Sequence, residues 1–80
     1  MATNKQAMDW EMSENDVKGI HKQVKVGGCK VWKLPQNNRI NACRVSEEEV
    51  TAEHYVGKEL IASFRHKAGE KVERIEPGEK

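Results

Sequence analysis

The side chains best suited to bind a ligand lie between residues 17 and 45, which hold seven lysine and arginine residues and no acid. Clustered lysine and arginine attract phosphate groups and release their counterions, so this composition suits a nucleic-acid ligand; a solvated basic face without a ligand is the alternative that charge alone leaves open. The flanking segments 1–16 and 46–80 each carry a net charge of −3. The small net charge of +1 therefore conceals one strongly basic segment.

One aromatic and several polar side chains of this segment are predicted to contact the nucleic acid. Lysine and arginine would contact phosphates, Trp32 would stack on a base, and asparagine would bind base edges or sugar hydroxyls. Cys29 and Val31 share one side of an extended strand, which favours an outward-facing Trp32; a Trp32 in the core is the alternative. The predicted site comprises Lys25, Lys30, Trp32, Lys33, Asn37, Asn38, Arg39, Asn41, Arg44 and Lys58.

Arrangements for catalysis or metal binding are weak in this sequence. The two cysteines and three histidines form no Cys-x-x-Cys or His-x-x-x-His pair, which structural zinc sites use. Cys29 or Cys43 with His54 could supply a nucleophile and a base, but a chain of 80 residues leaves little room for a substrate cleft. We therefore expect no enzymatic activity, no metal and no cofactor.

The composition indicates one small domain with a thin core, because only 36% of the residues are hydrophobic and 34% are charged. No apolar run is long enough to span a membrane, and the first residues lack the apolar region of a secretory signal. We expect a cytoplasmic monomer that binds no membrane, with two free thiols and a disulfide as the alternative. A flexible tail over 1–12, in which Trp10 and Met12 could dock, a domain over 13–77 and a frayed end over 78–80 are predicted.

The first half of the domain is predicted to hold a helix and two strands. Ser13 can cap a short helix in which Val17, Ile20, His21 and Val24 recur at helical spacing; the alternative is that this stretch leads into a strand. Residues 24–34 are predicted to be extended, with Gly27-Gly28 as a hairpin turn or a bulge. The other predicted elements are a turn at 35–38 and strands at 39–45 and 71–76.

Residues 46–68 support two different predictions. Ser46 and Glu49 form a capping box, and apolar residues every four positions favour one helix over 47–68. Gly57 and the β-prone residues before it favour a strand over 50–56, followed by a short helix over 58–68. The strand gives a small β-rich or α+β domain with an OB-like barrel, whereas the long helix gives an α-β-β-α-β domain.

Three stretches resemble the translation initiation factor one family, including its archaeal and eukaryotic counterparts. Residues 31–42 (Val-Trp-Lys-Leu-Pro-Gln-Asn-Asn-Arg-Ile-Asn-Ala) resemble the first hairpin of that family. Residues 50–58, with the Gly57-Lys58 pair, resemble its third strand and helix start, and residues 69–72 (Gly-Glu-Lys-Val) resemble the entry to its fourth strand. The resemblance covers about residues 29–77 and implies an S1-like OB barrel that binds ribosomal RNA without catalysis.

The expected function is therefore non-enzymatic binding of single-stranded or ribosomal RNA, or of another nucleic acid. Two alternatives remain. The separated charges would also suit a small regulator, of the kind viruses encode, that docks on a larger host protein. A small DNA-binding regulator is the third possibility, and it depends on the long helix over 47–68.

Overall fold

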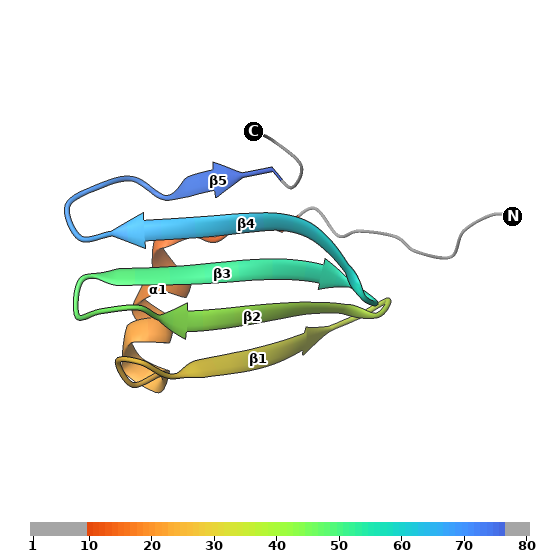
Figure 1. Ribbon diagram of the computed structural model, residues 1–80, viewed down its shortest axis with the longest axis horizontal. Coiled ribbons are helices and arrows are strands. Elements are labelled where there is room, and N and C mark those ends of the chain that lie inside the picture. Colours follow the sequence, from red (N-terminus) through yellow and green to blue (C-terminus); the bar gives the residue numbers. More distant parts are fainter. Residues whose placement is uncertain (1–9, 77–80) are drawn as a thin grey trace, which may run out of the picture.

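The computed structural model describes residues 10–76, which form one helix and five strands. The strands make one antiparallel sheet in the order β1-β2-β3-β4-β5, and α1 lies across one face of it (Figure 1). Each strand therefore pairs with its neighbour in the chain. The elements are α1 (Glu14–Gln23), β1 (Cys29–Leu34), β2 (Asn38–Arg44), β3 (Glu49–Val56), β4 (Glu59–Lys67) and β5 (Glu73–Ile75).

Helix α1 begins where its capping signal predicts. The Ser13 hydroxyl accepts a hydrogen bond from the backbone N–H of Asp16, at 3.1 Å, and the Asp16 carboxylate accepts one from the Ser13 N–H at 2.8 Å. This reciprocal pair satisfies backbone donors that a helix start leaves unpaired. Val17 and Ile20 are buried against the sheet, which confirms the predicted helix and its apolar face.

The Gly27-Gly28 pair joins α1 to β1, so it is neither the predicted hairpin turn nor a bulge. The N–H of Gly27 donates to the Arg44 carbonyl at 2.8 Å, and the Arg44 N–H donates to the Gly28 carbonyl at 3.0 Å. Gly27 has φ +86°, which a residue with a side chain rarely adopts. The loop after the helix is thereby held against the end of β2.

The predicted turn at residues 35–38 closes the β1–β2 hairpin. Gln36 and Asn37 have φ of 61° and 62°, and two successive residues of this kind suit a tight turn between twisted strands. The predicted strand over 39–45 is confirmed as β2, and burial alternates along it, with Ile40 and Ala42 inside. The last predicted strand is confirmed as the shorter β5.

Both predicted helices within residues 46–68 are wrong, because β3 and β4 occupy this region. Apolar residues every four positions suit a helix, but the same spacing also keeps side chains on one face of a strand. In the structure every second residue along most of β3 and β4 is buried. Two of these buried residues are His54 and His66, so a search for alternating apolar residues does not detect the strands. Gly57, with φ +60°, forms the turn between the strands.

The prediction of a small β-rich or α+β domain is confirmed, but the sheet does not close into a barrel. β1 and β5 lie at opposite edges of one open sheet, as Figure 1 shows. The α-β-β-α-β alternative is wrong, because β3 and β4 lie where it required a long helix. The OB-like architecture is therefore not confirmed within the described part of the chain.

The core lies between α1 and the face of the sheet that it covers. The Trp10 ring packs edge-on against Phe64, with 5.2 Å between ring centroids, and Met12 is buried, so both residues dock as the sequence allowed. Residues 1–9 of the predicted tail, and the predicted frayed end over 78–80, lie outside the described residues. The core cluster contains Met12, Val17, Ile20, Val24, Ile40, Ala42, Val50, Ala52, Ala62 and Phe64.

Candidate functional site

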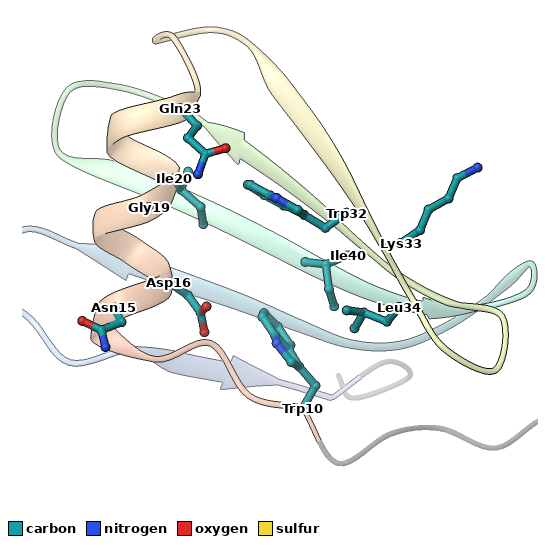
Figure 2. A pocket seen from close by; sticks show the side chains of 10 residues that line it. All are labelled: Trp10, Asn15, Asp16, Gly19, Ile20, Gln23, Trp32, Lys33, Leu34 and Ile40. Carbon is teal, nitrogen blue, oxygen red and sulfur yellow. The ribbon is translucent and has the colours of Figure 1, made fainter.

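A groove of about 310 Å³ runs between α1 and the edge strand β1. Two tryptophans contribute to it from different parts of the chain: Trp10 precedes the helix, and Trp32 lies in β1 (Figure 2). Its walls are mostly apolar, with polar side chains contributed by one face of the helix. The lining residues are Trp10, Asn15, Asp16, Gly19, Ile20, Gln23, Trp32, Lys33, Leu34 and Ile40.

Trp32 faces the helix, so the prediction that it points away from the core is wrong. It is the register partner of Ile40, which is buried, and it is itself half-buried in the groove. The sequence argument placed Val31 in the core, but Val31 is 48% exposed on the opposite face. Trp32 and Lys30 do share a face, as predicted, and it is the face that carries α1.

Lysine side chains lie on both sides of β1. The Lys30 ammonium donates to the Gln23 side-chain carbonyl at 3.0 Å and lies 5.5 Å from the centroid of the Trp32 ring, which allows a cation–π interaction. Lys33 is exposed, lines the groove, and is the register partner of Arg39. Within residues 10–76 no strand pairs with the outer edge of β1, so backbone donors and acceptors along that edge can bind a ligand.

Arg39 and Arg44, both predicted to contact phosphate, have structural roles. Arg39 donates to the Gly57 carbonyl at 2.6 Å, and its guanidinium lies 4.4 Å from the centroid of the Tyr55 ring. Arg44 donates to the carbonyls of Val24 and His21 at 3.1 and 3.4 Å, at the end of α1. Carbonyls at a helix C-terminus attract a positive charge, so Arg44 caps the helix.

Asn38 was predicted to bind a base or sugar, but it is only 2% exposed and cannot reach one. Its amide nitrogen donates to the carbonyls of Pro35 and Gln36, each at 3.0 Å. Its side-chain oxygen accepts from His54 Nε2 at 2.7 Å. Asn38 therefore joins the β1–β2 turn to the buried histidine of β3.

The buried His54 predicts a stability that falls in mild acid. Burial, and to a smaller degree the charge of Arg74, lower the pKa of His54, so the folded protein resists the protonation that the unfolded chain accepts. Stability is then fully present above the unfolded pKa of about 6.5 and falls as the pH drops toward the folded pKa, by at most about 1.4 kcal/mol per pH unit. Urea unfolding at pH values from about 7.5 to 5 measures this slope.

Two variants test whether His54 causes this dependence of stability on pH. His54→Gln is expected to be less stable overall and to lose most of the slope, whereas His21→Gln, at a more exposed position of α1, should keep it. A slope that is unchanged in His54→Gln would contradict the assignment.

The remaining predicted residues lie in three places. Lys25 is exposed in the loop between α1 and β1. Asn37 and Lys58 are exposed in two adjacent turns, where the Gly57 N–H donates to the Asn37 carbonyl at 2.9 Å. Asn41 is half-buried on the open face of the sheet, between Val31 and Glu53 in register. The structure thus brings Lys25, Lys30, Trp32 and Lys33 to one edge and separates the others from it.

Sequence reasoning missed the helical side of the groove. Asn15, Gly19 and Gln23 are spaced four residues apart and therefore share a helix face, with Asp16 beside them. A Cβ at Gly19 would meet no atom within 4 Å, so the glycine leaves this wall open. The sequence contained one signal for this wall of the groove, which was Gly19 inside a helical pattern. The element that lies opposite Gly19 is known only from the position of β1 in the fold.

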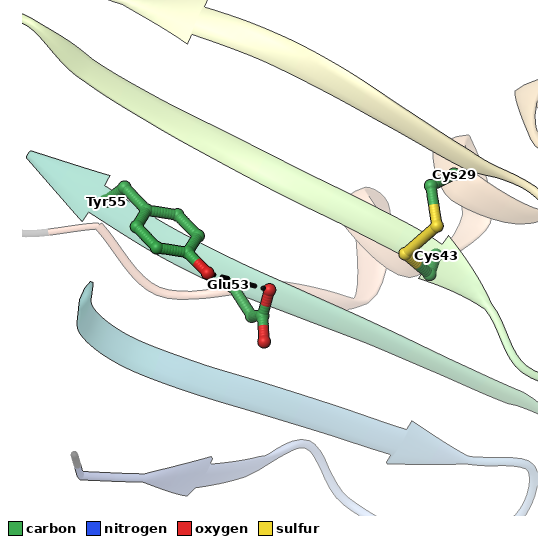
Figure 3. The surroundings of a disulfide bond; sticks show 4 residues. All are labelled: Cys29, Cys43, Glu53 and Tyr55. Carbon is green, nitrogen blue, oxygen red and sulfur yellow. Dashed lines mark hydrogen bonds between the residues drawn. A yellow bond between two sulfur atoms is a disulfide. The ribbon is translucent and has the colours of Figure 1, made fainter. Parts of the chain in front are cut away.

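The open face of the sheet carries a disulfide between Cys29 and Cys43, so the prediction of two free thiols is wrong. The two residues are direct register partners in β1 and β2, with their Cα atoms 4.0 Å apart (Figure 3). On the same face Tyr55 donates to a Glu53 carboxylate oxygen at 3.3 Å. Burial, and then the nearby Glu53 charge, raise the pKa of Tyr55. A cysteine nucleophile is therefore absent from the disulfide-bonded chain.

The fold and groove define a small domain in which one helix covers an open five-stranded meander and leaves a tryptophan-lined groove at the sheet edge. Comparisons with protein-family models, curated proteins and solved structures found no significant match. Across residues 10–76 no three His, Cys, Asp or Glu side chains are grouped to hold a metal ion. No helix in the same range is long and apolar enough to cross a membrane.

Proposed function

We propose that the protein binds single-stranded nucleic acid, RNA in particular, along the β1 edge of the sheet. The observation that carries this proposal is a set of exposed lysines in the last turn of α1, in the loop after it and in β1, none of which forms an ion pair with an acid of residues 10–76. These residues are Lys22, Lys25, Lys30 and Lys33.

The opposite edge has a different electrostatic character. There Arg65 pairs with Glu73 at 2.9 Å, and Arg74 pairs with Glu11 at 3.2 Å and with Glu76. The two arginines on that side are therefore paired within the protein, although the exposed Lys67 and Lys71 toward β5 form no ion pair with a described residue. The two edges differ mainly in their acids, because Glu73 and Glu76 lie at the β5 edge and β1 carries none, and this difference favours a polyanion at the β1 edge.

The geometry of β1 suits an extended strand. Six residues span roughly 20 Å, so Lys30 and Lys33 lie roughly 10 Å apart along the edge and can contact different phosphates of one chain. Trp32 lies between them and presents an aromatic ring to the groove, where a base can stack. Base–aromatic stacking is worth about 1–3 kcal/mol per base and tolerates any sequence.

The proposal keeps the RNA ligand that the initiation factor resemblance implies, but it moves the site from a barrel surface to a sheet edge and a groove. Ribosomal RNA, a cytoplasmic location and binding without catalysis belong to the same proposal. The DNA-binding alternative is not retained, because it depended on a helix over 47–68 where β3 and β4 lie.

The test is fluorescence anisotropy of a labelled single-stranded RNA, such as a uridine 12-mer, titrated with the protein at about 50 and 200 mM salt. We expect binding that weakens with salt, with a log–log slope of about −0.7 for each phosphate contacted. An RNA duplex of the same length is the matched ligand control and should bind more weakly. An absence of binding at the lower salt would overturn the proposal.

A second candidate function rests on the free edge of β1. An extended acidic peptide could add to it as a sixth strand, with backbone hydrogen bonds for affinity and lysines for charge complementarity. Such binding would correspond to the small protein-binding regulator that the sequence offered as an alternative function. Capture of a partner from lysate that survives nuclease treatment would favour it over RNA, and loss of the partner after nuclease would count against it.

A further inference from the structure

The aromatic sides of the groove are held in place before any ligand arrives. Trp10 packs nearly perpendicular to Phe64, at 88°, and also edge-on to His54, with 6.2 Å between ring centroids. Trp32 is packed against the core and has the Lys30 ammonium over its ring. The opening of about 310 Å³ accommodates a planar nucleobase, and the surrounding apolar side chains would desolvate its faces.

One acidic side chain points into this otherwise basic region. In Figure 2 the Asp16 carboxylate extends from α1 toward Trp10, on the groove side of the helix. Its hydrogen bonds within residues 10–76 both use Oδ2, which accepts from the Ser13 N–H at 2.8 Å and from the Ser13 hydroxyl at 2.9 Å. No group of these residues donates to Oδ1, so that oxygen can accept from a ligand.

A carboxylate discriminates among bases by the groups on their pairing edges. Guanine presents two neighbouring donors, a ring N–H and an amino group, which one carboxylate oxygen can accept together. Adenine and cytosine place an acceptor nitrogen beside their amino group, and that lone pair would face the negative charge. Uracil has a single ring N–H between two carbonyl oxygens, which the carboxylate repels.

We propose that the groove between α1 and β1 binds one guanine base of the nucleic-acid strand, with Asp16 as the group that selects it. This inference rests on the proposed function, because the lysines of the β1 edge hold the strand from which the base enters. Trp32 stacks on the base, Asp16 accepts its ring N–H and amino protons, and the phosphates remain at the basic edge outside the groove. The Asp16 carboxylate inside the groove thus selects the base, and the lysines of the β1 edge bind the phosphates.

The test compares three labelled RNAs that differ at one position: all uridine, one central guanosine, and one central inosine, which lacks the amino group of guanosine. We expect the guanosine RNA to bind about tenfold more tightly than the uridine RNA, because two adjacent hydrogen bonds to one base carry discrimination of this size. The inosine RNA should fall between them. Because the change is made in the ligand, protein folding cannot affect this comparison.

Two variants separate the carboxylate from the helix cap. Asp16→Asn should bind the guanosine and uridine RNAs with equal affinity, because the carboxylate that favours guanine and repels the uracil carbonyls is gone. Ser13→Ala breaks the same cap, keeps the carboxylate and should keep the guanosine preference. Far-UV circular dichroism establishes that both are folded. Equal binding of guanosine and uridine RNA, or a preference that survives Asp16→Asn, overturns the inference and leaves the proposed function standing. Failure of all three RNAs to bind overturns both.

Discussion

Replacing Cys29 and Cys43 together by serine is expected to lower the free energy of unfolding by about 3 kcal/mol. The disulfide joins residues 14 apart in the sequence, and a cross-link that closes a loop of that length restricts the unfolded chain by about this amount. For a domain of 80 residues such a loss is a large share of the total stability, which is typically about 5–15 kcal/mol. Urea unfolding of the oxidised protein and of the variant measures the difference.

Reduction of the wild type provides the matched control for this variant. Treatment with dithiothreitol should lower the urea midpoint of the wild type to that of the serine variant and leave the variant unchanged. The loss of stability should also differ along the chain, because Cys29 is the first residue of β1, which among the described residues pairs with β2 alone. We expect amide hydrogen exchange to accelerate most in β1. A reduced wild type as stable as the oxidised form would contradict the prediction.

Local signals predicted the elements whose structure is decided locally. The Ser13 cap, the helical spacing after it and the turn at residues 35–38 each depend on residues within one or two turns of chain, and the structure contains all three. The β2 strand was also predicted, with each of its bounds within one residue of the observed ones. Tertiary structure adds little to these elements beyond their packing.

The elements that were predicted wrongly are those whose structure depends on pairing between strands. The capping box at Ser46 and Glu49 favours a helix locally, but in the structure β3 and β4 pair with each other and place Ala52 and Phe64 in the core shared with α1. The disulfide likewise depends on the β1–β2 register, which places Cys29 opposite Cys43. A one-residue shift of that register would put the two cysteines on opposite faces of the sheet.

The candidate site was only partly predictable for the same reason. The acid-free basic segment identified the lysines of β1, because charge composition is visible without a fold. The direction of Trp32 depended on which face of β1 meets the helix, and Asp16 and Trp10 become site residues only when α1 docks beside that strand. Arg44 and Asn38 resemble ligand-binding residues in the sequence, but their hydrogen-bond partners belong to the protein itself.

Replacing Lys30 and Lys33 by glutamate is expected to weaken binding of the uridine 12-mer by about 10-fold to 100-fold at low salt, because two phosphate contacts are lost and two like charges are introduced. The salt dependence should change with it: removing two contacts should reduce the log–log slope by about 1.4. Both side chains are exposed, so the fold should be retained. Anisotropy titrations over a range of salt concentrations measure both quantities.

Net charge alone would also weaken RNA binding, so the control is Lys67→Glu with Lys71→Glu, which makes the same charge change at exposed positions toward the β5 side. If the β1 edge is the site, the control should lose only a small part of the affinity and keep the wild-type slope. Equal losses in the two variants would mean that RNA responds to total charge rather than to this edge. A normal affinity in the Lys30 and Lys33 variant would remove the β1 edge as the site and leave the free strand edge without a role in RNA binding.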